Sequence, residues 1–195
     1  MNTREHTTMK MRGNPDISYL GHTVDQMIWS FMEQEKIDGL TLAIVQAPYI
    51  PRVAGYGYSD SQRRRLASPN TMWPAGPISQ AFAAVAVMQL HEDGGLDVNR
   101  RACVYIPELP DAWKDITVLQ LLRHASGLPD YRRAPEFSPD TPWTFDALLQ
   151  LAARNPLHFV PGTDVEQSAT NFLLLTEIVE RVSGLSYHDF VTKRQ

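Results

Sequence analysis

The stretch "PISQAFAAVAVMQL", from Pro77 to Leu90, constrains the fold more than any other segment of the chain. Its nearly continuous apolar run from Ile78 predicts a helix that is buried on all sides. Pro77 suits the first turn of that helix, where its missing N–H is not needed. The "EDGG" that follows predicts a glycine cap at the other end. A helix buried all round lies at the centre of a domain, so other elements have to surround it.

The other predicted elements are mostly helical. An amphipathic pattern predicts a helix over 17–35, and "LTLAIVQA" (40–47) predicts a strand buried on both faces. "RVAGYGYS" (52–59) predicts a second strand, in which Gly55 and Gly57 indicate close approach of other backbone. Further helices are predicted over 116–127, 144–154 and 168–184 and after Ser186.

These elements predict an α+β fold whose sheet is incomplete. A lone two-stranded hairpin is marginal in water, and its outer edges stay open to pairing. We therefore expect the remaining strands to be absent from this chain. A homo-oligomer or a partner chain is then expected to complete the sheet by strand addition.

Composition excludes several classes of partner. The formal net charge is -4 and no basic stripe is present, so nucleic acid is not expected to bind. The single cysteine and the six histidines have no metal-ligand spacing, so no metal or other cofactor is expected. No segment has the length and apolarity of a membrane span. Residues 1–16 are interpreted as a flexible polar tail without a secretory signal, which predicts a cytoplasmic protein.

Four stretches, in order, resemble the serine β-lactamase and penicillin-binding-protein superfamily. They are "IDGLTLAIV", "GPISQAFAAVAVMQLHEDGGLDVNRRACVYIPEL", "ITVLQLLRHASGLPDY" and "PGTDVEQSATNFLLLTEIVERVSGLSYHDFV". The most similar branch is the class C β-lactamase-like group, which includes D-alanyl-D-alanine carboxypeptidases and esterases. The resemblance implies a partial β-lactamase/transpeptidase-like domain over 17–195. A helix and hairpin over 17–60 and a helical lobe over 70–195 would make up that part.

The resemblance also implies a serine hydrolase site, but the matching positions hold other residues. The family's nucleophilic serine and the lysine of S-x-x-K correspond to Pro77 and Gln80 in "GPISQAF". The tyrosine and asparagine of Y-x-N correspond to Gln167 and Ala169 in "QSA". The third motif, K-T-G or H-x-G, is expected beyond residue 195. No catalytic residue can therefore be assigned, and we expect an inactive protein.

Three functional hypotheses remain open, all with an unknown ligand. In the first, the chain is a pseudoenzyme that serves as a binding or scaffolding module. In the second, it is half of a domain that a partner completes. In the third, it is a working hydrolase (esterase, amidase or β-lactam/D-Ala peptide hydrolase) that uses an unidentified nucleophile or a second chain. Ser79 and Ser126 are candidates for such a nucleophile, although Ser79 has no lysine three residues on. Ser126 matches a serine that the family keeps in addition to its nucleophile. The candidates for a ligand pocket are Gly76, Tyr131, Glu166 and Ser168.

Overall fold

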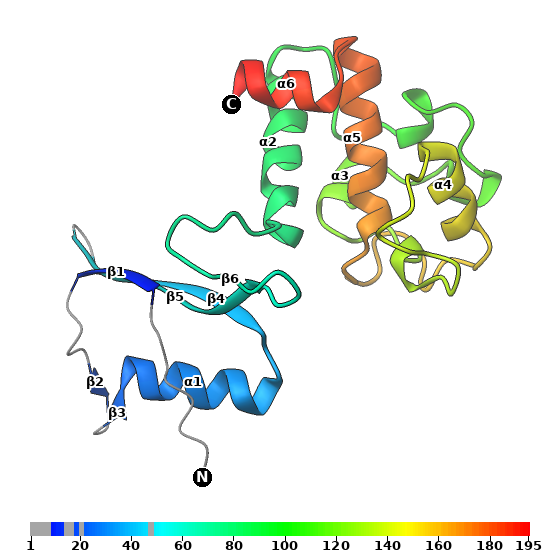
Figure 1. Cartoon of the computed structure of the whole chain (residues 1–195). Helices are drawn as coiled ribbons and strands as arrows, with labels where there is room; N and C mark the ends of the chain where they lie inside the picture. The colour runs from blue at the N-terminus through cyan, green and yellow to red at the C-terminus, as the bar shows by residue number, and fades with distance from the viewer. Residues whose placement is uncertain (1–8, 14–17, 20–21, 47–48) are drawn as a thin grey trace. The chain divides into compact units, whose positions relative to one another are not determined.

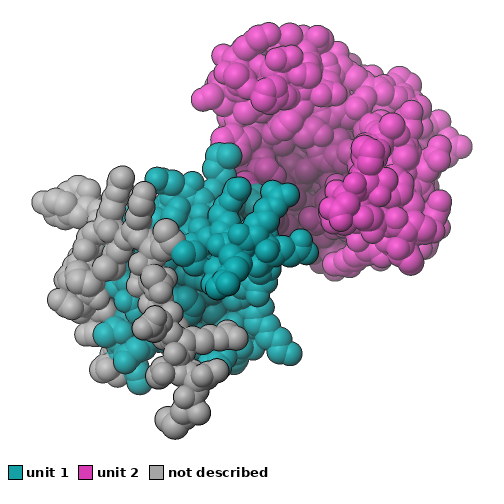
Figure 2. Space-filling model, in the orientation of Figure 1, with its two compact units in different colours: residues 1–74 teal, residues 75–195 magenta. Residues whose placement is uncertain are grey.

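A computed structural model describes residues 9–13, 18–19, 22–46 and 49–195. The chain divides into two compact units, Met1–Pro74 (unit 1) and Ala75–Gln195 (unit 2), which Figure 2 distinguishes by colour. The division lies just before the apolar helix, whereas the helical lobe was predicted to begin at residue 70. Each unit is described separately.

Unit 1 consists of a small antiparallel sheet with one helix packed on it (Figure 1). The sheet order is β1-β5-β4, and β6 also pairs with β5. A separate short hairpin is formed by β2 and β3. The bounds are β1 Met9–Gly13, β2 Ser18–Tyr19, β3 His22–Thr23, α1 Val24–Glu35, β4 Gly39–Gln46, β5 Tyr49–Asp60 and β6 Arg65–Leu66.

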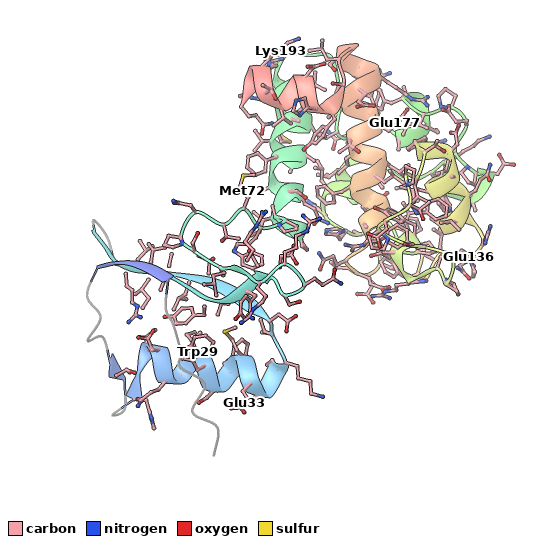
Figure 3. The ribbon with its side chains drawn as sticks, viewed as in Figure 1. Trp29, Glu33, Met72, Glu136, Glu177 and Lys193 are labelled. Atoms are coloured by element: carbon pink, nitrogen blue, oxygen red, sulfur yellow. The ribbon has the colours of Figure 1, made fainter. Side chains whose placement is uncertain are left out.

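The small core of unit 1 lies between α1 and the sheet. Met32 on the helix packs against Ala54 and Tyr56 of β5, and all three are buried. Trp29 contacts the Tyr56 ring edge-on at 5.6 Å between centroids. Figure 3 shows Trp29 on the face of α1 turned toward the strands and Glu33 on the opposite side. The prediction of an amphipathic helix is confirmed only in part, because Met27 and Phe31, which belong to the apolar pattern, are 44% and 48% exposed.

A charged pair also joins α1 to the sheet. The Arg52 side chain is fully buried and forms an ion pair with Asp25 in the first turn of the helix. Its guanidinium also donates to the Tyr56 hydroxyl at 3.2 Å. Burial opposes ionisation of Asp25, yet the hydrogen bonds and charge of Arg52 and the hydrogen bond of Tyr56 hold the pKa of Asp25 below its usual value.

Three predictions about unit 1 were wrong in part. The helix begins at Val24 because Thr23 forms a capping box with Gln26, and the predicted start at Ile17 lies outside the described residues. Met9–Gly13, within the predicted tail, forms a strand paired with β5. β4 is not buried on both faces, since Val45 is 67% exposed. Among the described strands β4 pairs only with β5, so it lies at a sheet edge.

The glycines of β5 have the expected role. A Cβ at Gly55 would lie 2.4 Å from the carbonyl oxygen of Ala67, and one at Gly57 would lie 2.1 Å from that of Asp38. No side chain fits at such distances, so glycine permits these two backbone approaches. The prediction of close backbone contact at these positions is confirmed.

Unit 2 is helical and is organised around α5 (Figure 1). This helix contacts α2, α3, α4 and α6, and its residues Leu174, Leu175, Ile178 and Val179 are fully buried. Side-chain caps at Thr117, Thr144, Ser168 and Ser186 start four of the helices. The bounds are α2 Ser79–Glu92, α3 Val118–Leu122, α4 Phe145–Ala153, α5 Ala169–Ser183 and α6 Tyr187–Arg194.

The apolar helix α2 differs from its prediction. Ala83, Ala86, Val87 and Leu90 are buried, but Ile78 is 71% exposed and Phe82, Val85 and Met88 are about half exposed. The exposed residues recur at intervals of three or four, so they form one stripe along the helix. We call Ile78, Phe82, Val85 and Met88 the α2 stripe. The prediction of burial on all sides was therefore wrong for this face.

In the described part of the chain, no helix has the length and apolar character that a membrane crossing requires.

Candidate functional site

The beginning of α2 forms the first wall of the candidate site. Gly76–Ile78 form a single 3-10 turn, and the α-helix follows from Ser79. Pro77 is thus placed in the turn that leads into the helix, where its lack of an N–H leaves no hydrogen bond unmade. The Ser79 hydroxyl donates to the Gly76 carbonyl at 2.6 Å.

A chain of hydrogen bonds, which we call the His124 network, holds the side chain of Gln80. Nδ1 of His124 accepts from the Ser168 backbone N–H at 3.3 Å and from Nδ2 of Asn171 at 2.9 Å. Because a backbone N–H can only donate, Nδ1 carries no proton, and the proton of the neutral ring is on Nε2. Nε2 then donates to Oε1 of Gln80 at 3.2 Å.

The His124 network continues from Asn171 to Ser126 and Leu128. Oδ1 of Asn171 accepts from the Ser126 hydroxyl at 2.5 Å, and the Ser126 oxygen accepts from the Leu128 N–H at 3.1 Å. Ser126 and Asn171 are fully buried. The buried side-chain oxygens of the His124 network therefore have partners, which is the arrangement that makes a buried polar network stable.

His124 is the strained centre of the network. Its φ of 55° is in the left-handed region, which non-glycine residues seldom adopt. Burial lowers the pKa of His124 below its usual value, while the Asp130 carboxylate opposes that shift. The ring also packs against Phe172 at 5.1 Å between centroids. These contacts favour the neutral ring that the hydrogen-bond pattern requires.

Two hollows adjoin this wall. The first, which we call the Gln80 pocket, has a volume of about 250 Å³ and is lined by Gly76, Pro77, Ser79, Gln80, Tyr131, Arg132, Ala169, Phe172, Leu173 and Thr176. The second is lined by Pro77, Asp130, Arg132, Arg133 and Gln167. Pro77 and Arg132 border both hollows.

The charges around the hollows are paired. Nε and Nη2 of Arg132 bond to the Asp130 carboxylate, which is 7% exposed, with the shortest contact at 2.8 Å. Burial works against the Asp130 anion, but its bonds to Arg132 keep its pKa below the usual value. Arg133 is bonded to Glu166 at 2.8 Å. Burial raises the pKa of Tyr131, so its phenol stays neutral at physiological pH.

The structure brings most of the singled-out positions together. Gly76, Pro77, Ser79, Gln80, Tyr131 and Ala169 line the Gln80 pocket, and Gln167 lines the second hollow. Ser168 is buried, where it caps α5 by accepting from the Thr170 N–H. Glu166 is hydrogen-bonded to His158 at 2.7 Å and forms an ion pair with Arg133. Its bond from His158, followed by that of Arg133, lowers the pKa of Glu166.

Two other residues of the site were missed by sequence reasoning. Asn171 closes the His124 network, and Arg132 borders both hollows. The signal for Asn171 was its polarity within the apolar "ATNFLLL" of α5. Nothing in the described part of the chain groups three or more His, Cys, Asp or Glu side chains in a metal-binding arrangement.

Comparison with known proteins gives the family of this chain. A family model described as Beta-lactamase matches residues 24–194. The chain belongs to the beta-lactamase family. The match spans both compact units and includes the start of α2 and the loop before α5.

The relatives of this beta-lactamase-family chain are considerably longer. It is 26% identical over 173 residues to protein flp of Staphylococcus aureus (strain N315), covering 87% of this chain and 35% of flp. The octameric penicillin-binding protein homologue from Pyrococcus abyssi is 26% identical, with a TM-score of 0.69, covering 86% of this chain and 40% of that one. The chain thus spans about a third of the curated relative.

A third similarity concerns the fold alone. The D-amino acid amidase from Ochrobactrum anthropi SV3, solved with L-phenylalanine, is 24% identical, with a TM-score of 0.74. It covers 87% of this chain, which covers 47% of the amidase. The α+β, β-lactamase-like fold predicted from the four stretches is therefore confirmed, as is membership of the penicillin-binding-protein-related superfamily.

Proposed function

We propose that this chain is a non-hydrolytic member of the beta-lactamase family that serves as a binding or scaffolding module. The observation that carries the proposal is the Gln80 side chain. It occupies the position that matches the family's lysine, and its amide is hydrogen-bonded to a neutral His124. An amide cannot accept a proton at physiological pH, so this position supplies no general base.

The remaining family positions support the same proposal. Pro77, at the nucleophile position, has no hydroxyl to attack a carbonyl. Gln167 and Ala169, which match the Y-x-N positions, line the two hollows with an amide and a methyl group. None of these side chains titrates near neutral pH.

Neither serine candidate has an activating base as the partner of its hydroxyl among the described residues. Ser126 is fully buried and donates to Asn171. Ser79 donates to a backbone carbonyl rather than to a base. Both ring nitrogens of His124 already have partners, so that imidazole has no free lone pair for either hydroxyl.

The test is acylation and turnover. We expect no labelling by a fluorescent penicillin and no hydrolysis of p-nitrophenyl esters above the buffer rate, because loss of a catalytic serine alone lowers turnover by about 10⁶-fold. Ser79→Ala and Ser126→Ala are the matched variants. Labelling that either substitution abolishes would overturn the proposal and support the working-hydrolase alternative.

We further propose that a second chain or a second copy completes the sheet of unit 1. The β4 edge is uncharged, and Val45 on it is 67% exposed. An uncharged edge strand offers unpaired backbone groups to another strand. The octameric state of the Pyrococcus abyssi homologue makes self-association a reasonable form for this completion.

Light scattering on the eluted protein tests this second proposal. We expect a mass above that of one chain, 22.0 kDa, or a shift to a higher mass when the partner is added. Hydrogen exchange should then be slow at the outward-facing amides of β4. A monomer whose β4 amides all exchange quickly would count against sheet completion.

A further inference from the structure

The ligand chemistry of the Gln80 pocket follows first from the orientation of one amide. Because the neutral His124 must donate through Nε2, it selects Oε1 of Gln80 as its acceptor. This hydrogen bond fixes the amide of Gln80, and the Nε2 group of the amide is left on the side away from His124. Among the described residues no partner bonds to it, and Gln80 lines the pocket. Its two N–H groups are therefore available to a ligand acceptor.

The neighbouring residue supplies the complementary group. The hydroxyl proton of Ser79 is directed to the Gly76 carbonyl at 2.6 Å. A hydroxyl oxygen whose proton is engaged can still accept a hydrogen bond. Ser79 and Gln80 therefore present an acceptor and a donor on the same pocket wall.

The charge of the lining excludes a strong preference for ions. Arg132, which carries the positive charge of this lining, is bonded to the nearly buried Asp130 carboxylate. A guanidinium already paired with a carboxylate has little attraction left for an anionic ligand. Pro77, Ala169, Phe172 and Leu173 add apolar surface, and Tyr131 and Thr176 are two further uncharged residues of the lining. The lining thus combines uncharged polar groups, one neutralised charge and apolar surface.

We propose that the Gln80 pocket binds small uncharged amides that carry an apolar group, with Gln80 as the residue that orients them. The ligand C=O accepts from Nε2 of Gln80, the ligand N–H donates to Oγ of Ser79, and the apolar group contacts Phe172. This inference rests on the proposed function, since the amide is bound and not cleaved. A volume of about 250 Å³ suits a fragment-sized molecule.

Three probes of the same skeleton test the proposal on the full chain: 2-phenylacetamide, phenylacetate and 2-phenylethylammonium. Ligand-detected NMR titrations should give the amide a dissociation constant in roughly the millimolar range, as expected for a ligand of this size. The amide should bind about 3 to 10 times more tightly than either ion, the usual effect of one hydrogen bond.

Gln80→Glu is the decisive variant. The carboxylate keeps an acceptor for Nε2 of His124, so the His124 network stays intact, but it replaces the N–H donor by an acceptor. The amide preference should disappear, and the ammonium probe should become the best ligand. Gln89→Glu is the matched control, since Gln89 is on the same helix and outside the pocket lining. It should leave the order of the three probes unchanged.

The same spectra separate two kinds of failure. Conversion of 2-phenylacetamide into phenylacetate would show hydrolysis and overturn the proposed function. Equal binding of the three probes, or an amide preference that survives Gln80→Glu, would overturn the amide-binding inference and leave the non-hydrolytic proposal standing.

Discussion

The two units are stabilised in different ways. Unit 2 has a continuous apolar core that extends from Ala86 on α2 to Phe190 on α6. Among the described residues of unit 1, Met32, Ala54 and Tyr56 form the core cluster, Ala67 is also buried, and the fully buried Arg52 bonds to Tyr56. A core with few apolar groups contributes little hydrophobic free energy. The buried pair of Arg52 and Asp25 is therefore expected to matter more for the stability of unit 1, whereas unit 2 depends on close apolar packing.

The largest expected effect is in the core of unit 2. Leu174→Ala removes a fully buried side chain at the centre of α5, and we expect a loss of about 2–5 kcal/mol in the unfolding free energy of unit 2. Hydrogen exchange measured peptide by peptide reads the two units separately. Val160→Ala, at a position that is 69% exposed, is the control and should be nearly neutral. An equal loss of protection in unit 1 would show that the units do not unfold independently.

A comparable effect is expected from breaking the charged pair of unit 1. Asp25→Ala removes the carboxylate that pairs with the buried Arg52 guanidinium, and we expect a loss of about 2–4 kcal/mol in the unfolding free energy of unit 1. Because the described core of unit 1 is small, we expect that loss to unfold unit 1 while unit 2 stays folded. Glu33→Ala on the exposed side of the same helix is the control. Retention of slow exchange throughout β5 in Asp25→Ala would contradict the central role given to this pair.

A smaller effect follows from protonation of the same carboxylate. The folded pKa of Asp25 is below the usual 3.8, so ionisation contributes stability that is present above that pH and is lost as the pH falls through the folded value. Acid unfolding of unit 1 should therefore be steeper in the wild type than in Asp25→Asn. Chemical denaturation at pH 3 and pH 6 measures the difference. Parallel pH dependences of the two proteins would exclude Asp25 as the source.

A still smaller effect is expected on the α2 stripe. Ile78→Ser changes a side chain that is 71% exposed, so the stability of unit 2 should change by less than about 0.5 kcal/mol. Val87→Ser, on the buried face of the same helix, is the contrasting variant. It should lower the unfolding free energy of unit 2 several-fold more than Ile78→Ser does. A strongly destabilising Ile78→Ser would mean that the stripe is covered in solution.

No effect on activity is expected from restoring the family residues in unit 2. The combined variant Pro77→Ser, Gln80→Lys, Gln167→Tyr and Ala169→Asn puts the family residues back at the four matching positions. The new lysine ammonium faces the Nε2–H of His124, where Gln80 supplied an acceptor. Penicillin labelling of this variant should stay at the level of the unmodified protein. Labelling of the introduced serine would show that unit 2 needs nothing more than these four groups.

Much of the fold could be predicted because local patterns determine it. The caps at Thr117 and Ser186 and the left-handed end at Gly184 are short-range signals, and the structure has all three. Burial was harder to predict, because it is not determined by local signals. The apolar runs at 40–47 and 78–90 indicate which residues can be buried. Whether they are buried depends on the elements that pack against them. Val45 is 67% exposed and Ile78 is 71% exposed, although both belong to apolar runs.

The candidate site was predictable in its positions but not in its bonding. Motif spacing located Pro77, Gln80, Gln167 and Ala169, and the structure places them around two hollows. The His124 network could not be predicted, since it joins residues more than 40 positions apart and depends on a left-handed backbone at His124. Only the three-dimensional structure shows that Gln80 has a fixed orientation.

The edge strand β4 has a consequence for the solubility of the protein. Its "LTLAIV" segment has high β-propensity, no charge and no proline, the composition of segments that assemble into fibrils. Because the described core of unit 1 is smaller than that of unit 2, we expect unit 1 to unfold first and to release this segment when the protein is stressed. Precipitation on storage or heating should therefore start from unit 1. A lysine in place of Val45, on the exposed side of the strand, is the simplest way to delay it.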